Sequence, residues 1–247
     1  MEFSDDEVER YARQLVLAEL GGPGQQKLRA GSVLIVGCGG VGGPAALYLA
    51  AAGVGRIGLI DPDTVALSNL QRQIQFATAD IGLAKPDATA RRLAALNPHV
   101  AIDPIAGRFD AVTGRALAAR FDVVLDGTDD FETRLAVNDA CLAEGRPLVS
   151  GALGRWTGQV GIFAGRPCYR CLVPAPPPEA ETCARVGVVG ALAGVIGSMA
   201  ALEAVKLITG AGEPLVGRLL VYDGLRSETR TARIQADPGC PACGKDQ

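Results

Sequence analysis

The chain has 247 residues, enough for one large domain or two small ones, and its apolar content of 48% is ample for a hydrophobic core. The net charge of −3 and the lack of a basic cluster disfavour a nucleic-acid-binding protein. Residues 1–10 carry no apolar run, so we expect no signal peptide. Seven cysteines without such a signal indicate a reducing, cytoplasmic setting, with metal ligands or reactive thiols rather than disulfides.

The first part of the chain alternates between helix and strand. Ser4 and Glu7 form a capping-box pattern, which predicts a helix through about Leu20 that Gly21-Gly22 ends. The elements predicted next are strand 33–37, helix 41–53, strand 56–61, a helix from Pro86 to about Leu96, strand 100–105, helix 112–120, strand 122–126, helix 130–144 and strand 147–150. Such alternation is typical of a parallel doubly wound sheet.

The pattern changes after Gly151, where strands are predicted without matched crossover helices. They cover 159–163, 218–222 and 227–235, and the last alternates like an antiparallel strand. We therefore predict an α/β fold with a doubly wound, Rossmann-like mixed sheet, parallel in its N-terminal part and antiparallel in its C-terminal extension. We expect a single domain over residues 1–247, in which 1–150 bind nucleotide and zinc staples the extension at 151–247.

One apolar segment, residues 186–202, contains no charged side chain and so resembles a membrane span. It is short for a span and contains four glycines. Glu203 and Lys206 continue the same helical pattern until Gly210, which is suited to cap the helix. We therefore predict a buried or interface helix and no membrane association.

The loop between the first strand and its helix, residues 37–42, reads Gly-Cys-Gly-Gly-Val-Gly. Gly37 permits the tight turn, Gly39 lets backbone N–H groups approach a phosphate, and Gly42 lets the helix pack on the strand. Asp61 ends the next strand, where a carboxylate can accept both ribose hydroxyls. The pattern predicts a nucleotide site but does not separate NAD, FAD and ATP.

The residues that follow favour a triphosphate over a dinucleotide. Residues 68–73 read Ser-Asn-Leu-Gln-Arg-Gln, and Arg72 with Lys85 can neutralise phosphate charge. Asp129 follows strand 122–126, at the carboxyl edge where doubly wound folds bind ligands, and can hold Mg²⁺. The alternative interpretation of Asp129 is a helix N-cap paired with Glu132.

The other chemically reactive side chains are mostly cysteines. His99 is the only histidine, so a histidine-based triad is disfavoured and His99 is interpreted as structural. Cys183 has Arg185 two residues on, and a nearby cation can lower a thiol pKa, which makes Cys183 a candidate nucleophile. Cys38 and Cys141 are interpreted as packing residues.

Two C-x-x-C pairs are present, Cys168 with Cys171 and Cys240 with Cys243. They predict a closed tetrahedral zinc site with a structural role. The alternative interpretation is two redox pairs or four free thiols.

Taken together, these motifs resemble the MoeB/ThiF/HesA family, the bacterial relatives of ubiquitin-activating enzymes. The likeness covers nearly the whole chain. It rests on Tyr11-Ala12-Arg13-Gln14, the loop at 37–42, Asp61, the run at 68–73, Lys85, Thr128-Asp129, Cys183 and the four paired cysteines. The string Ser-Asn-Leu-Gln-Arg-Gln and the paired cysteines are its most specific parts.

The resemblance implies an enzyme that uses ATP and Mg²⁺ to adenylate a small ubiquitin-like sulfur carrier protein of the MoaD or ThiS type, at its C-terminal Gly-Gly. It implies that Asp129 binds Mg²⁺, and that Arg13 reaches the site from the second subunit of a homodimer. It leaves the role of Cys183 open, since only some relatives use that cysteine covalently. The residues implied to bind ATP are Gly37, Gly39, Gly40, Gly42, Asp61, Asn69, Arg72, Gln73, Lys85 and Asp129.

The sequence departs from the family pattern in three places. Asp130 stands where an asparagine is usual, and Pro86 follows Lys85. The chain stops four residues after Cys243 without a rhodanese domain, so we expect a separate sulfur donor, such as a cysteine desulfurase or a separate rhodanese. The pathway stays open among molybdopterin, thiamine, cysteine and tRNA thiolation.

Three other functions compete with the carrier interpretation. A tRNA threonylcarbamoyladenosine dehydratase has the same kind of ATP site, but the net charge of −3 and the paired cysteines favour a carrier substrate. An NAD-dependent oxidoreductase would leave Arg72, Lys85 and Asp129 without a use. A non-catalytic, zinc-stapled binding module would not need Lys85 or Asp129.

Overall fold

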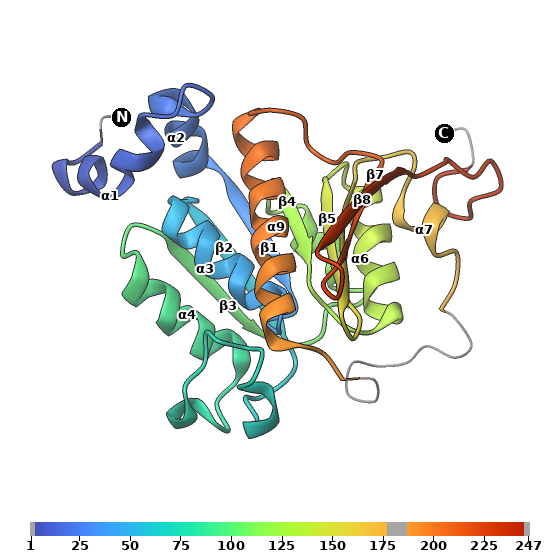
Figure 1. Ribbon diagram of the computed structural model, residues 1–247, viewed down its shortest axis with the longest axis horizontal. Helices are drawn as coiled ribbons and strands as arrows, with labels where there is room; N and C mark the ends of the chain where they lie inside the picture. The colour runs from blue at the N-terminus through green and yellow to red at the C-terminus, as the bar shows by residue number, and fades with distance from the viewer. Residues whose placement is uncertain (1–2, 177–186, 245–247) are drawn as a thin grey trace.

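The computed structural model describes residues 3–176 and 187–244, and its centre is one eight-stranded sheet (Figure 1). The strand order is β3-β2-β1-β4-β5-β6-β7-β8. Neighbours from β3 to β5 pair in parallel, and those from β5 to β8 pair antiparallel, so the predicted mixed sheet is confirmed. The strands are β1 Ser32–Val36, β2 Arg56–Asp61, β3 Ala101–Ala106, β4 Val123–Asp126, β5 Leu148–Leu153, β6 Thr157–Phe163, β7 Arg218–Asp223 and β8 Glu228–Arg233.

Helices cover both faces of the sheet because strand side chains alternate between two apolar cores. Val33 and Ile35 point into the core beneath α3 and α9, whereas Leu34 and Val36 point into the core beneath α6. The helices in the described residues are α1 Asp5–Leu15, α2 Gly21–Ala30, α3 Gly42–Ala52, α4 Lys85–Leu96, α5 Gly114–Ala118, α6 Phe131–Ala143, α7 Tyr169–Leu172 and α9 Gly190–Thr209, with 3₁₀ turns at Leu67–Asn69 and Thr78–Asp80.

The first helix is shorter than predicted. The capping box of Ser4 and Glu7 is present, but α1 ends at Leu15. Gly21 and Gly22 begin α2 instead of ending α1, so the prediction was wrong at this point. Proline is tolerated in the first turn of a helix, where N–H groups need no intrahelical partner, and Pro23 lies in that turn of α2.

Helix α9 runs along one face of the sheet (Figure 1). By length and composition it is the one helix in the described residues that could cross a membrane, with 44% of its most apolar window buried. Its buried side packs on α3, β5 and β6, and a Cβ at Gly197 would lie 2.6 Å from the Val41 carbonyl oxygen. Gly210 caps it with a φ of 78°, as predicted. The close fit shows that this side of α9 belongs to the core that covers the sheet.

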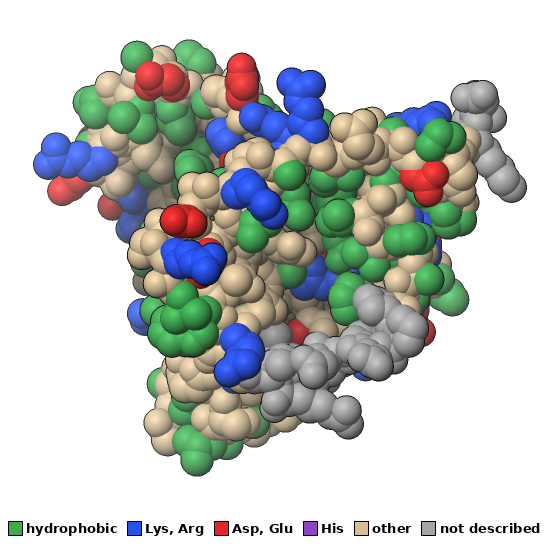
Figure 2. All heavy atoms as spheres, turned by 45° about the vertical axis from the view of Figure 1, so that its right-hand side comes forward, with side chains coloured by type: hydrophobic (Ala, Val, Ile, Leu, Met, Phe, Trp, Pro, Cys, Tyr) green, Lys and Arg blue, Asp and Glu red, His purple; other side chains and the backbone are tan. Residues whose placement is uncertain are grey.

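The two outer strands differ from the central ones. β3 contains Pro104 at one edge of the sheet, and every side chain of β8 is exposed at the other. β5 spans position 150, so the sheet continues across the boundary expected between nucleotide-binding part and extension. That division into two parts stays a prediction. Figure 2 shows Lys and Arg side chains in separate groups over one face of the molecule, among apolar and acidic ones.

Candidate functional site

A cavity of about 840 Å³ lies at the carboxyl ends of the parallel strands. Strand order reverses direction between β1 and β4, and this switch point is where open α/β sheets bind ligands. The cavity brings together most of the residues predicted to bind nucleotide: Gly37, Gly39, Gly40, Asp61, Asn69, Arg72, Gln73, Lys85 and Asp129.

The glycine loop has the geometry that its sequence predicts. Gly37 has a φ of 89°, which side chains rarely tolerate, and a Cβ at Gly42 would lie 1.9 Å from the Gly37 carbonyl oxygen. A Cβ at Gly39 would meet only the Gln73 side chain, at 3.6 Å, so the space above the loop is open to the cavity. No described residue accepts a hydrogen bond from the backbone amides of Gly39 and Gly40. These amides are therefore available to an anion.

Asp61 lies at the end of β2 beneath this loop. Its two carboxylate oxygens accept hydrogen bonds from the backbone N–H groups of Cys38, at 2.7 Å, and of Asp63, at 2.8 Å. Burial raises the pKa of Asp61, and the nearby positive charge of Lys85 opposes that rise. Each oxygen keeps a second lone pair, so the carboxylate can also accept hydrogen bonds from ribose.

The predicted cations line the same cavity. Lys85 is 6% exposed, and its Nζ lies 2.8 Å from Asp63 Oδ2 and 4.0 Å from Asp61 Oδ1. Arg72 donates to the Ser68 carbonyl oxygen at 3.0 Å, which fixes one end of its guanidinium. The buried Oε1 of Gln73 has no partner among the described residues, which suits a site that a polar ligand completes.

Two adjacent acidic residues at the start of α6 have different roles. The N-cap is Asp130, whose Oδ1 accepts a hydrogen bond from the Thr133 backbone N–H at 2.7 Å. The predicted capping pair of Asp129 and Glu132 was therefore wrong. Asp129 lines the cavity, and no described residue donates a hydrogen bond to its carboxylate. Its charge acts on the nearby Arg134, but no hydrogen bond from a described residue occupies its oxygens, so they can also bind a cation.

A buried arginine next to the segment that carries Asp129 and Asp130 was not predicted. Arg134, on α6, lies 3.4 Å from Asp126 Oδ2 and donates to the carbonyl oxygens of Thr128 and Gly151, the latter at 2.9 Å. Burial lowers the pKa of Arg134 more than any single neighbour raises it, but the combined effect of Asp126, Tyr169 and Asp129 leaves the pKa raised. No local signal in the sequence marks Arg134, since its partner Asp126 lies on β4 and not on the same helix.

Not every predicted residue is seen at the cavity. Gly42 packs against Gly37 behind the loop and is not part of the cavity lining. Cys183 lies outside the described residues. Arg13 is exposed on α1 and does not line the cavity of its own chain.

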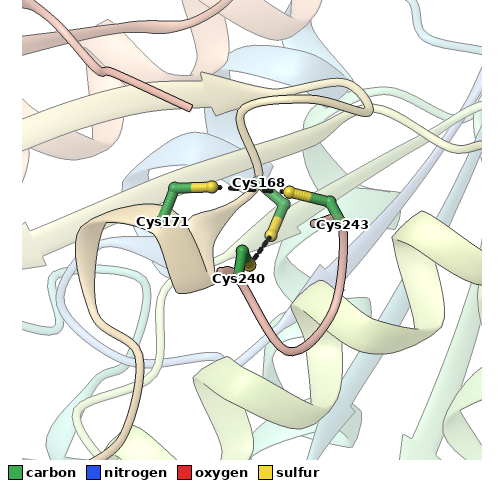
Figure 3. A group of neighbouring side chains, drawn as sticks. All are labelled: Cys168, Cys171, Cys240 and Cys243. Atoms are coloured by element: carbon green, nitrogen blue, oxygen red, sulfur yellow. Dashed lines mark hydrogen bonds between the residues drawn. The ribbon is translucent and has the colours of Figure 1, made fainter. Parts of the chain in front are cut away.

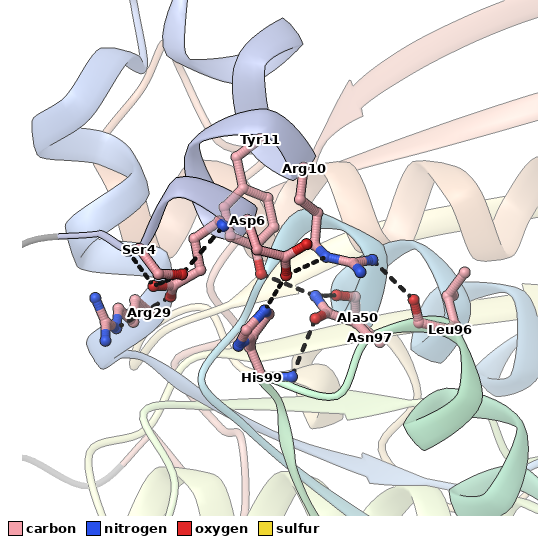
Figure 4. Close-up of polar contacts among 10 residues, drawn as sticks. Ser4, Asp6, Arg10, Tyr11, Arg29, Ala50, Leu96, Asn97 and His99 are labelled. Carbon is pink, nitrogen blue, oxygen red and sulfur yellow. Dashed lines mark hydrogen bonds and ion pairs between the residues drawn. The ribbon is translucent and has the colours of Figure 1, made fainter.

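Figure 4 shows how α1 is held to the core. Asn97 donates to Tyr11 Oη at 2.9 Å and to the Ala50 carbonyl oxygen at 2.7 Å. His99 Nε2 lies 2.6 Å from Asp6 Oδ2.

The four paired cysteines meet as predicted, with all sulfur atoms within 4.8 Å of one another. In Figure 3 they come from two segments far apart in the chain, with Cys168 and Cys171 facing Cys240 and Cys243. The Sγ distances are 3.6 Å for Cys168–Cys240 and 3.4 Å for Cys171–Cys243. Sulfur atoms at about 2.3 Å from a tetrahedral zinc ion are about 3.8 Å apart, so the cluster can hold a metal ion of this kind.

Protein purified without chelator is expected to contain about one zinc ion per chain, because four thiolates form a closed tetrahedral site. Elemental analysis of the wild type measures this directly. The Cys141→Ala variant is a matched control, since Cys141 is a buried residue of α6 that is not part of the cluster, and the change should leave the zinc content unchanged. A zinc content well below one per chain would contradict the assignment.

Comparison with known proteins places the chain in a family. A model of the ThiF family matches residues 11–242. The chain is 42% identical to a sulfur carrier protein adenylyltransferase of Thermus thermophilus, over 100% of this chain and 94% of the relative. It is 44% identical to a molybdopterin-synthase adenylyltransferase of Escherichia coli K12, over 99% of both chains.

Longer relatives and a solved structure extend this picture. An adenylyltransferase and sulfurtransferase MOCS3 of Bos taurus is 49% identical over 98% of this chain, which spans 54% of that relative. A crystal structure of Escherichia coli MccB has a TM-score of 0.82 and 24% identity, covering 95% of this chain and 75% of that one, and supports the fold alone. The family match and the extent of identity together show that this chain belongs to the ThiF family.

Proposed function

We propose that this chain uses ATP to adenylate the C-terminal glycine of a small ubiquitin-like sulfur carrier protein that ends in Gly-Gly. The observation that carries the proposal is the cavity, which is lined by the glycine loop, Asp61, the cations Arg72 and Lys85, and the carboxylate of Asp129. The loop would bind phosphate and Asp61 would bind ribose. A dinucleotide oxidoreductase needs only the first two of these. The relatives named sulfur carrier protein adenylyltransferase and molybdopterin-synthase adenylyltransferase support a carrier substrate.

The proposed reaction requires little covalent chemistry from the enzyme. A carboxylate oxygen of the carrier attacks the α-phosphorus of ATP, the bond to the bridging oxygen breaks, and pyrophosphate leaves with the electron pair. The product is a carrier acyl-adenylate. Asn69, Arg72, Gln73 and Lys85 line the cavity where phosphates would lie, so the residues act by positioning ATP and neutralising charge.

A magnesium ion would be held by Asp129 together with the phosphates. Magnesium typically binds one or two carboxylates plus substrate phosphates, and Asp129 offers one carboxylate without a partner among the described residues. Bound there, the ion would withdraw charge from the phosphate oxygens. Asp130 is engaged as the N-cap of α6, so it is the less suitable ligand of the two.

The proposal extends to the partners of the reaction. The four-cysteine cluster would hold zinc and staple residues 237–244 to α7. A separate protein, such as a cysteine desulfurase or a rhodanese, would supply sulfur to the acyl-adenylate. Whether Cys183 takes part in that later step stays a prediction. The pathway depends on which carrier is bound.

Exchange of labelled pyrophosphate into ATP tests the proposal. The assay needs the purified chain, Mg²⁺, and one of several carriers ending in Gly-Gly, with a carrier truncated by its last two residues as the control. Exchange with an intact carrier and none with its truncated form is the expected result. Binding of ATP without exchange for any carrier would favour the tRNA dehydratase interpretation instead.

Arg13 is expected to complete the cavity of a second copy in a homodimer. Arg13→Ala and Asp129→Ala should each be nearly inactive. An equal mixture of the two, after subunit exchange, should regain about one quarter of the wild-type exchange rate, because half of the dimers are mixed and each has one intact site. Arg10→Ala, on the same helix, is the matched control and should stay active. No recovery in the mixture would contradict action across the dimer.

A further inference from the structure

The side chain of Gln75 connects the glycine loop to the segment that carries Arg72 and Gln73. It is 3% exposed and does not line the nucleotide cavity. Its Nε2 donates to the carbonyl oxygen of Cys38 at 2.9 Å and, more weakly, to that of Gly39 at 3.4 Å. A carbonyl oxygen can accept only from the NH₂ end of an amide, so these two contacts fix the orientation of the side chain.

The two carbonyl groups belong to the peptides whose N–H groups are those of Gly39 and Gly40. A trans peptide is planar, and its N–H points opposite to its C=O. The one cis peptide bond among the described residues is Arg166-Pro167, so both peptides of the loop are trans. Holding the carbonyl oxygens toward Gln75 therefore turns the two N–H groups away from it. Gly39 and Gly40 line the cavity, and no described residue accepts from these N–H groups, which leaves them to an anion.

The fold makes room for the Gln75 amide and leaves part of it unsatisfied. A Cβ at Gly43, the second residue of α3, would lie 2.2 to 2.3 Å from the atoms of this amide, so the amide can lie there only beside a glycine. The buried Oε1 of Gln75 has no hydrogen-bond partner among the described residues. An unpaired buried oxygen destabilises a fold, and an apolar side chain would fill the same space without it. The contact of the NH₂ group with the loop explains why an amide is placed here.

The segment that carries Gln75 is anchored by its own apolar contacts. Phe76, the next residue, is 8% exposed and packs in a small cluster with Val65 and Ala88. Arg72, earlier in the same segment, lines the cavity. Gln75 therefore joins two walls of the cavity, one that offers backbone N–H groups and one that offers a cation.

We propose that Gln75 is a positioning residue of the phosphate site. Its amide holds the carbonyl oxygens of Cys38 and Gly39 so that the N–H groups of Gly39 and Gly40 face a nucleotide phosphate. It also keeps the loop against the segment that carries Arg72. Gln75 does not touch the nucleotide and acts through the loop. The inference rests on the proposed function only in that the cavity binds the phosphates of ATP.

Displacement of a fluorescent ATP analogue by ATP and by adenosine, at one fixed Mg²⁺ concentration, tests this role. Both competitors would place ribose at Asp61, whereas only ATP has phosphates for the loop. Gln75→Met keeps the length of the side chain and removes the NH₂ group. It should weaken ATP binding by about 10-fold, the lower end of the effect of a hydrogen bond to a charged group, and leave adenosine binding unchanged. Gln25→Met is the matched control and should alter neither affinity, because Gln25 is a buried glutamine that donates to the Ala52 carbonyl oxygen and does not line the cavity.

A second variant disturbs the same contact from the opposite side. Gly43→Ala keeps Gln75 but places a Cβ where its amide lies, so it should cause the same selective loss of ATP affinity. Gly22→Ala is its control, because Gly22 is the second residue of α2 and a Cβ there would meet nothing within 4 Å. Circular dichroism shows whether each variant is folded, and either one alone can decide the question. If neither folds, the role of Gln75 is structural and the inference is wrong.

The remaining outcomes separate a positioning role from a structural one. Wild-type ATP affinity in Gln75→Met would overturn the inference, as would an equal loss for ATP and adenosine. A wild type that binds ATP no better than adenosine would overturn it too, since the loop would then contribute nothing. Pyrophosphate exchange is a separate readout. Its absence with every carrier, beside a selective loss of ATP affinity in Gln75→Met, would count against the proposed function and leave the positioning role standing.

Discussion

Replacing Asp129 with alanine is expected to lower the rate of carrier adenylation by about 100- to 1,000-fold, the cost of losing a metal that stabilises several kcal/mol of transition-state charge. The reason lies in the partners of the two adjacent acids. Asp130 is engaged in capping α6, whereas no described residue donates a hydrogen bond to Asp129. Its removal takes away a carboxylate that lines the cavity and accepts no hydrogen bond from a described residue, and it leaves the cap of α6 in place.

Carrier-dependent pyrophosphate exchange across a range of Mg²⁺ concentrations measures this effect. The matched control is Asp130→Asn, which places the residue usual in the family at the N-cap. Asparagine caps helices as well as aspartate does, so this variant should keep both stability and activity. Near-normal exchange by Asp129→Ala would show that the metal is held elsewhere.

Replacing Arg134 with methionine is expected to destabilise the fold by about 3–5 kcal/mol, the usual cost of leaving one partner of a buried ion pair unpaired. Its partner Asp126 is 1% exposed and cannot turn to solvent. The substitution would also leave the Thr128 and Gly151 carbonyl oxygens without their donor. Methionine retains much of the side-chain volume, so the loss reports charge and hydrogen bonding rather than a cavity.

Urea unfolding of the wild type and the variant measures the free energy of unfolding. Arg115→Met is the control, because Arg115 pairs with Glu144 at the surface and its side chain is 65% exposed. Its loss should be at most about 1 kcal/mol, as is usual for exposed ion pairs. The double variant Arg134→Met with Asp126→Asn should recover part of the stability. A small loss in Arg134→Met alone would mean that the Asp126 charge is compensated by other groups.

The parallel part of the sheet and its glycine loop were predictable because each element has a local cause. The glycines at 37 and 42 are required by a positive φ and by a carbonyl oxygen 1.9 Å from a would-be Cβ, and both constraints are local. The cysteine cluster was predictable for a different reason. Two C-x-x-C pairs in one chain are typical of a metal site. The contact between Cys168 and Cys240, 72 positions apart, could therefore be predicted from the ligand pattern.

Other features depended on tertiary contacts that the sequence does not display. Asp129 and Asp130 each have a residue three positions on that suits a cap, and only the path of the chain selects Asp130. Arg134 looks like a surface residue of a helix until Asp126 is placed beneath it. The glycines before Pro23 resemble a helix end as well as a helix start. Arg13 does not line the cavity of its own chain, so the role proposed for it requires a second chain.

The two edges of the sheet have a consequence for how molecules of this protein meet. An outer strand offers unpaired N–H and C=O groups to any strand from another molecule, and growth by such addition leads to fibres and swapped dimers. Here Pro104 removes a donor from the outer strand β3, and β8 surrounds its open groups with exposed Arg, Thr and Glu side chains. A strand approaching either edge meets a missing donor or a line of charge. Both edges of the sheet therefore disfavour pairing with a strand of another molecule, and concentrated protein should resist fibrous aggregation.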